Sequence, residues 1–347
     1  TELPTDGWEK FNVGILNLRN NRITELPKNI IKAPFLTSYN FNQNRLPSKP
    51  INQNSYAANK YEKLLWFKDF GFIKEHDLPK TDSMALAYIE KSSTHYYRKE
   101  YHKTIEAAES AIRINKQLAD QRLNIRNLGE AKFFTQDYKG AIENLTKAIK
   151  NDTAGKVRIM NFVNPDFVYR AKSYLKIGDT LSAINDYRIL GEKFNEDTWG
   201  EIGLLYHATG DNEKSKSSFA KGVASYTNYI SEAKKRKYDV ELKQLSLLEL
   251  LIIAEDFRKA QQYVSEIKNE IKGMGNKLLF NYLDACVKIA NNQAVNLKQL
   301  KEMLANDKKS VENWSYELFF KWLHLTKIEK QKAQSMRELS DVIKPDY

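Results

Sequence analysis

Residues 128–149 read LGEAKFFTQDYKGAIENLTKAI, and this stretch decides the fold of most of the chain. Apolar and small residues recur in it at helical spacing, first over 128–134 and then over 137–149. Each run therefore predicts an amphipathic helix that buries one face. Paired helices of this kind are expected to continue through the chain from about residue 83.

Small residues recur 12 positions apart along this helical region. The pairs are Gly129 with Ala141, Ala171 with Ala183, and Gly203 with Ser215. The pattern resembles the tetratricopeptide repeat family. The resemblance implies hairpins whose two helices cross closely, where only a small side chain leaves room. Large aromatic residues would fill the space around the crossings: Tyr138, Tyr174, Tyr187, Trp199, Tyr206 and Phe219.

The resemblance is most specific over residues 122–230 and weaker on both sides. It implies a mainly α fold over residues 81–347, a tetratricopeptide-like α-α superhelix built as a right-handed solenoid of helical hairpins. Gly-Asp pairs at 178–179 and 210–211 mark loops between helices. Residues 151–164 are expected to form a longer connection.

A second repeat, with a period of 23 residues, occupies the N-terminal 50 positions. The motif TELP at residues 1–4 returns at 24–27, and the same spacing relates Asn21 to Asn44. A short amide side chain at this position can satisfy the buried N–H and C=O groups of a turning backbone. Alternating apolar residues would point inward from two short strands: Leu16, Leu18, Tyr39 and Phe41.

This unit resembles the leucine-rich repeat family in its 23-residue form. The resemblance implies that residues 1–50 are the C-terminal end of a leucine-rich repeat array, a short α/β-type coil segment. Two coils are too few to close a core, so more coils are expected upstream. Residues 51–80 are expected to cap the last coil and link it to the helical repeats, with a helix over 55–72.

The charge of the chain bears on the choice of partner. The 347 residues carry a formal net charge of +11, from 55 basic and 44 acidic residues. Acidic residues are interspersed among the basic ones, except in the run 234–237. This pattern disfavours nucleic acid as a partner. No stretch approaches the roughly 20 apolar residues of a membrane span, so no transmembrane segment is expected.

No pattern of catalytic or metal-binding residues is found in the sequence. The five histidines form no metal-ligand pair, and the single cysteine, Cys286, lies on an apolar helix face typical of the core. The common nucleophile, phosphate-loop and dinucleotide motifs are missing. We therefore expect a protein that is not an enzyme and that holds neither a cofactor nor a metal.

The first helices of tetratricopeptide hairpins line a concave groove that usually receives peptides, and the resemblance implies this role for eight residues. The candidate peptide-binding residues are Tyr96, Tyr97, Arg126, Glu130, Phe134, Lys172, Lys176 and His207. Aromatic side chains with cations suit an extended acidic or C-terminal peptide. Chaperone-binding members clamp a terminal carboxylate with a Lys–Asn–Asn–Lys–Arg set. This chain instead has Ile89, Ser93, Arg126 and Glu130 at the first positions, which disfavours chaperone tails.

The leading hypothesis is a non-catalytic protein–protein interaction scaffold that binds a protein or peptide in this groove. Two alternatives remain open: binding of nucleic acid or an anionic surface through the net positive charge, and a peptide-sensing regulator. The family resemblance indicates a bacterial-type interaction protein. The 23-residue repeat is typical of intracellular leucine-rich proteins, which favours the cytoplasm, with a periplasmic or envelope-associated location left open.

Overall fold

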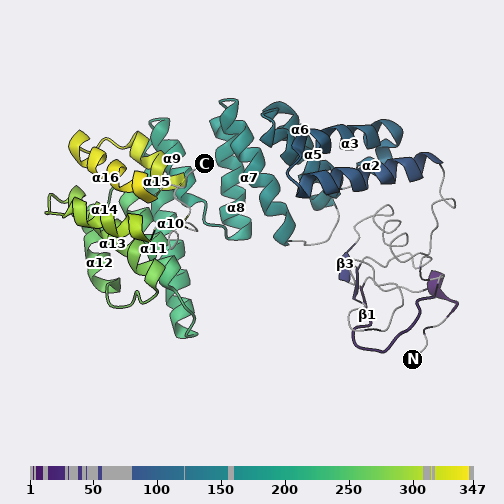
Figure 1. The fold of residues 1–347 in the computed structure, drawn as a ribbon, viewed down its shortest axis with the longest axis horizontal. Helices are drawn as coiled ribbons and strands as arrows, with labels where there is room; N and C mark the ends of the chain where they lie inside the picture. The colour runs from purple at the N-terminus through teal and green to yellow at the C-terminus, as the bar shows by residue number, and fades with distance from the viewer. Residues whose placement is uncertain are drawn as a thin grey trace. The chain divides into compact units, whose positions relative to one another are not determined.

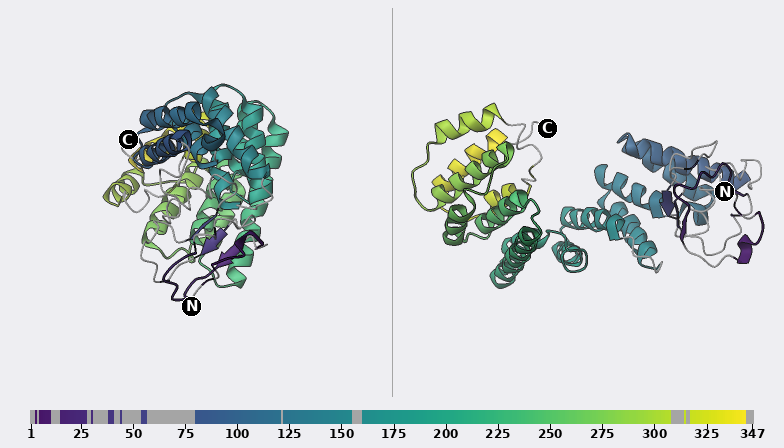
Figure 2. Two further views of the ribbon diagram at one scale, coloured as in Figure 1. Left: turned by 90° about the vertical axis from the view of Figure 1, so that its right-hand side faces the viewer. Right: turned by 90° about the horizontal axis from the view of Figure 1, so that it is seen from below.

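A computed structural model of the chain describes residues 3, 5–10, 15–27, 30, 38–40, 44, 54–56, 80–120, 122–154, 160–307, 314 and 317–343. The described part is mainly α-helical and tetratricopeptide-like, as the repeat pattern predicts (Figures 1 and 2). It divides into two compact units, Thr1–Asp179 and Thr180–Tyr347.

The helical part of the first unit is built from antiparallel neighbours. Its helices are α2 (Lys80–Tyr97), α3 (Tyr101–Ile114), α4 (Lys116–Ala119), α5 (Arg122–Phe134), α6 (Tyr138–Ala154) and α7 (Met160–Lys176). α2 packs against α3, and α5 packs against α6. α5 also contacts α2 on one side and α7 on the other, so α2, α5 and α7 are successive members of one layer.

Short elements precede these helices. They are the 3-10 helix η1 (Trp8–Lys10) and the strands β1 (Ile15–Asn17), β2 (Ser38–Asn40) and β3 (Asn54–Tyr56). β1 and β2 pair in parallel with Ile15 opposite Ser38, an offset of 23 residues that equals the sequence repeat. β3 then pairs antiparallel with β2.

The side chain of Asn44 forms hydrogen bonds with the backbone groups of the turn that follows β1. Its Oδ1 accepts hydrogen bonds from the N–H groups of Asn21 (3.1 Å) and Ile23 (2.9 Å). Its Nδ2 donates to the carbonyl of Leu18 at 2.7 Å. Asn44 thus links the segment after β2 to the segment after β1, and Leu16 of β1 is buried.

Two expectations about chain connections need correction. Ser55 and Tyr56, predicted to begin a helix, lie instead in β3, because pairing with β2 satisfies backbone groups that an edge strand would expose. The remainder of that predicted helix lies outside the described residues. The expected connection over 151–164 is shorter than predicted, because α6 continues to Ala154 and α7 already begins at Met160. Pro165 is tolerated inside α7, at the loss of one backbone hydrogen bond.

The turns between successive helices repeat one geometry. A residue with positive φ lies two positions after the end of one helix, and the acidic residue that follows it directly precedes the next helix. These pairs are Lys99-Glu100, Gln136-Asp137, Gly178-Asp179, Gly210-Asp211 and Glu255-Asp256. Gly210 has a φ of 84°, where the missing Cβ removes a steric cost. The Asp211 carboxylate then caps the following helix by accepting a hydrogen bond from Lys214 N–H at 3.1 Å.

The second unit continues the helical pattern. Its helices are α8 (Thr180–Phe194), α9 (Trp199–Ala208), α10 (Asn212–Lys235), α11 (Glu241–Ile253), α12 (Phe257–Ile267), α13 (Met274–Ala290), α14 (Leu297–Asn306), α15 (Glu317–Leu325) and α16 (Lys330–Ile343). One apolar core joins most of them, with Leu248, Tyr282 and Trp322 almost fully buried. Cys286 is fully buried in the same core, which confirms its predicted role as a core residue, and burial raises the pKa of its thiol.

The close helix crossings fall where the small residues predict them. Ser215 Oγ donates a hydrogen bond to the Gly203 carbonyl at 2.8 Å, and a methyl group on Gly203 would lie 2.5 Å from the ring of Phe219. A methyl group on Gly129 would lie 2.8 Å from Leu145 Cγ. Larger side chains at these two glycines would therefore push the paired helices apart.

Candidate functional site

The first candidate site is the surface that α2, α5 and α7 share in the first unit. At its centre, Arg126 of α5 donates two hydrogen bonds to Asp166 of α7, from Nε at 2.5 Å and from Nη2 at 2.6 Å. Arg126 is 7% exposed and Asp166 is fully buried. This bidentate ion pair ties α5 to α7 beneath the surface, and the Arg126 charge is held there by Asp166.

A second polar contact ties α2 to α5. The Tyr96 hydroxyl donates a short hydrogen bond to Glu130 Oε2. Burial raises the pKa of the Glu130 carboxyl, as does the neighbouring Asp166, while the hydrogen bond from Tyr96 and the Arg126 charge oppose the rise. Burial and the bond to Glu130 also raise the pKa of Tyr96. Both contacts fix the positions of the three helices relative to one another.

A group of aromatic rings adjoins these polar contacts through Tyr96. We call this group the aromatic cluster: Tyr96, Tyr97, Tyr101, Phe133, Phe134 and Tyr169. Phe134 stacks on Tyr101 with ring centroids 4.4 Å apart, and it meets Tyr169 edge-on at 5.5 Å. Tyr97 is 80% exposed and Phe134 is 41% exposed, so the cluster presents large apolar area to solvent.

The structure brings four of the eight predicted binding residues together. Tyr96, Tyr97, Glu130 and Phe134 meet in or beside the aromatic cluster, and Arg126 lies buried next to them in its ion pair. The remaining three predicted residues are elsewhere on the helices. Lys172 is half-buried and Lys176 exposed on α7, and His207 is half-buried on α9 of the second unit.

Four residues of this site are not among the eight predicted binding residues. Tyr101, Phe133, Tyr169 and Asp166 contribute to it, although the repeat pattern selected none of them for binding. Tyr169 lies three residues before the predicted residue Lys172 on α7, so extension of the predicted set by one helical turn would have found it. Asp166 lies 40 residues from Arg126, and no spacing in the sequence points to that pair.

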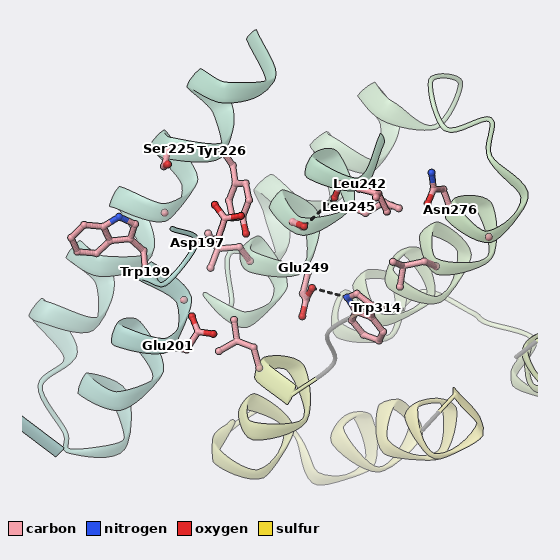
Figure 3. Close-up of a pocket in the computed structure, with 17 residues that line it drawn as sticks. Asp197, Trp199, Glu201, Ser225, Tyr226, Leu242, Leu245, Glu249, Asn276 and Trp314 are labelled. Carbon is pink, nitrogen blue, oxygen red and sulfur yellow. Dashed lines mark hydrogen bonds between the residues drawn. The ribbon is translucent and has the colours of Figure 1, made fainter. Parts of the chain in front are cut away.

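The second candidate site is a cavity of about 430 Å³ inside the second unit (Figure 3). Residues of α9, α10, α11, α13 and α15 line it, together with Trp314. Its walls are mostly apolar or aromatic: Trp199, Tyr226, Leu242, Leu245, Leu250, Leu279, Trp314 and Leu318. The volume lies in the range of roughly 300–1,000 Å³ that small-ligand pockets occupy.

Carboxyl groups supply the charge in this cavity. Figure 3 shows Glu201 of α9 and Glu249 of α11 turned toward the same space. Glu249 is 8% exposed, and its Oε2 accepts a hydrogen bond from Trp314 Nε1 at 2.9 Å. Burial, with a smaller contribution from Glu201, raises the pKa of Glu249 to about 8. Nothing in the sequence marked this residue, which lies within the apolar run of α11.

Lysines meet the edge of this cavity without entering it. Lys243 forms an ion pair with Asp197 and lies over the Tyr226 ring, 5.5 Å from its centroid. Lys221 lies over the Trp199 ring at 4.6 Å. Both lysines therefore interact with groups at the edge of the cavity, and the charged groups that line its interior are carboxyls.

The described residues contain no group of three or more His, Cys, Asp or Glu side chains placed to hold a metal ion. Within the same residues, none of the helices combines the length and apolar character that a membrane crossing requires.

Comparison with known proteins gives only distant likenesses. No protein-family model matches the chain, and no curated protein matches it. A tetratricopeptide repeat protein from Parabacteroides merdae is 18% identical with a TM-score of 0.38, over 74% of this chain and 99% of its own. The C-terminal part of a TPR repeat-containing protein from Cytophaga hutchinsonii is 13% identical with a TM-score of 0.43, over 74% and 100%.

A third solved structure is the complex of the TPR2AB domain of yeast Sti1 with pHSP90. It is 17% identical with a TM-score of 0.28, over 75% of this chain and 97% of its own. At these scores the likenesses carry no argument about function. The assignment of the fold therefore rests on the hairpins and close crossings of the chain itself.

Proposed function

We propose that the chain is a non-catalytic protein-interaction scaffold whose first unit binds an extended acidic peptide across α2, α5 and α7. The observation that carries this proposal is the aromatic cluster. In it the large side chains of Tyr97 and Phe134 are exposed, and their rings pack against those of Tyr96 and Tyr101. Exposed aromatic side chains of this kind are the residues that most often dominate the binding energy of interfaces. The interaction itself needs no reactive group.

The rigidity of the base favours binding. Phe134 is held between Tyr101 and Tyr169, and nearer the start of α5 the Arg126–Asp166 ion pair joins α5 to α7. Side chains that are already ordered lose little conformational entropy when a partner binds. A peptide laid across the three helices would therefore retain most of the energy of its contacts.

The distribution of charge favours an acidic peptide. Residues 1–179 include 29 basic and 20 acidic residues, whereas residues 180–347 include 26 and 24. The first unit therefore holds nearly all of the net positive charge, and Lys176 is exposed on α7 next to the proposed path. Positive potential of this kind steers acidic partners and speeds their association.

The proposal is tested by fluorescence anisotropy with the full chain. The probes are labelled peptides that share one aromatic and apolar core and differ in their number of acidic residues. Affinity is expected to rise with acidic residues, and Tyr97→Ala with Phe134→Ala is expected to weaken the best peptide on the order of tenfold or more. Tyr238→Ala, which removes a 63% exposed tyrosine of the second unit, is the matched control.

Two results would contradict the proposal. Equal loss of affinity in the double variant and in the Tyr238 control would remove the aromatic cluster from the binding site. Binding of a duplex DNA or RNA probe more tightly than any peptide, with a steep dependence on salt, would favour the charge-driven alternative instead.

We further propose that residues 1–50 are the end of a leucine-rich repeat array. The parallel pairing of β1 and β2 at an offset of 23 residues supports it, and so do the three hydrogen bonds of the Asn44 amide. Asn44→Ala is expected to speed hydrogen exchange at the amides of Asn21 and Ile23. Unchanged exchange at both amides would contradict this assignment.

A further inference from the structure

The cavity of the second unit is not part of the proposed peptide surface, and its chemistry differs from it. All of its lining residues belong to Thr180–Tyr347. Asp197, Glu201 and Glu249 line it, and none of the described lining residues is Lys, Arg or His. The cavity lining thus has acidic residues and no basic ones among the described residues, whereas the chain as a whole carries a net positive charge.

Glu249 has a buried carboxyl oxygen that accepts no hydrogen bond from the described residues. Its side chain is more than nine-tenths buried and turned into the cavity (Figure 3). Oε2 accepts a hydrogen bond from Trp314, but Oε1 accepts none from the described residues. A buried carboxyl oxygen without a donor costs free energy, and a ligand that brings an N–H donor or a positive charge would remove that cost.

The groups that face Glu249 from the neighbouring helices are acidic or neutral. They are Glu201 of α9, Tyr226 of α10 and Tyr282 of α13, each of which interacts electrostatically with Glu249. Asp197 lies farther out and is paired with Lys243. The residues that the structure describes thus provide no cation for Glu249, although Lys243 provides one for Asp197 at the edge.

The walls around Glu249 suit a cation on an apolar stem. Trp314 places its indole ring at the cavity and its N–H on the Glu249 carboxyl, and Tyr226 adds a second ring. Aromatic faces attract ammonium and guanidinium groups. Leu245, Leu250 and Leu279 provide apolar surface on which the methylene groups of a long side chain can pack.

We propose that this cavity binds the side chain of a lysine or arginine from a partner polypeptide, with Glu249 as the counter-ion and Trp314 and Tyr226 as aromatic walls. Burial of the cationic head against Glu249 satisfies Oε1, and the stem packs on the leucines. The second unit therefore selects a basic side chain, while the first unit prefers an acidic segment.

Proton release accompanies this binding. Because burial raises the pKa of Glu249 to about 8, the empty cavity holds a largely protonated carboxyl at pH 7. A cation placed against it favours the ionised form, so binding expels the proton. Close to one proton is expected to be released for each lysine side chain bound at pH 7. This release separates binding at Glu249 from adsorption to exposed carboxylates elsewhere on the surface, which are already ionised.

Calorimetry with the full chain tests the proposal. The probes are acetyl-Ala-Lys-Ala-amide, its arginine counterpart and its norleucine counterpart, which keeps the stem and lacks the charge. Titrations in buffers of different ionisation enthalpy count the protons released. The lysine and arginine peptides are expected to bind at least tenfold more tightly than the norleucine peptide, with about one proton released at pH 7.

Glu249→Gln keeps the size of the side chain and an acceptor for Trp314, and it is expected to abolish both the preference and the proton release. Glu302→Gln, an exposed glutamate of α14 that does not line the cavity, is the matched control. The proposal is overturned if the lysine and norleucine peptides bind alike, or if Glu249→Gln binds lysine as the parent chain does.

Discussion

Removal of the Glu249 carboxyl is expected to stabilise the second unit in a strongly pH-dependent way. The pKa of this carboxyl is about 8 in the folded chain, against an ordinary value of 4.5 that applies in the unfolded chain. A carboxyl whose pKa is raised by folding imposes no cost below pH 4.5. Its cost grows as pH rises from 4.5 to 8 and is constant above that window.

The magnitude follows from the size of the shift. Each pKa unit corresponds to about 1.4 kcal/mol, so the raised pKa of Glu249 costs the fold about 5 kcal/mol above pH 8 and about 3 kcal/mol at pH 7, relative to a carboxyl that ionises freely in the unfolded chain. Glu249→Gln removes the titration and retains an oxygen that can accept from Trp314 Nε1. The variant is therefore expected to gain on the parent chain by these amounts, with the gain vanishing near pH 4.5.

Urea unfolding measures this gain. Trp199, Trp314 and Trp322, three of the five tryptophans, lie in the second unit, so tryptophan fluorescence reports mainly its unfolding, and both chains are compared at pH 5, 7 and 9. Glu302→Gln controls for the loss of one negative charge at an exposed position. A stability difference that stays constant between pH 5 and pH 9, or that falls as pH rises, would refute the reasoning.

Three further substitutions test the packing of the fold. Asp166→Asn leaves the buried Arg126 charge without its bidentate partner, and it is expected to destabilise the first unit by about 3–5 kcal/mol in urea unfolding. Gly203→Ala places a methyl group 2.5 Å from the Phe219 ring, and a loss of about 1–3 kcal/mol is expected in the same assay. Asp211→Ala removes the cap of α10, and a loss of about 1 kcal/mol is expected in thermal unfolding followed by circular dichroism. Unchanged stability in any of these variants would contradict the corresponding contact.

Features that repeat along the chain could be predicted from the sequence. The pair Gly203 and Ser215 stands at a fixed spacing of 12, and the structure places the two at one helix crossing. The amide of Asn44 likewise recurs one repeat after Asn21, and its contacts follow from that spacing. In both cases the sequence period imposes the same packing on each repeat, so the contacts predicted for one repeat also apply to the others.

Features that depend on tertiary placement could not be predicted. In the sequence, Glu249 is a single charged residue within an apolar run. Its place in the cavity wall becomes visible only with Trp314, which is 65 residues away and donates a hydrogen bond to it. The partner of Arg126 is 40 residues away, so its charge looked available for a ligand although Asp166 holds it. Tyr56 has helical spacing to later apolar residues, but pairing with β2 decided its conformation instead.

The most direct test of the central claim is photo-cross-linking of the tightest acidic peptide, carrying a diazirine leucine, to the full chain. Mass spectrometry then locates the cross-linked residues. If the first unit receives an extended peptide as we propose, the cross-links fall on α2, α5 and α7, and Tyr97→Ala with Phe134→Ala abolishes them. Cross-links confined to other helices, or retained in the double variant, would contradict the account.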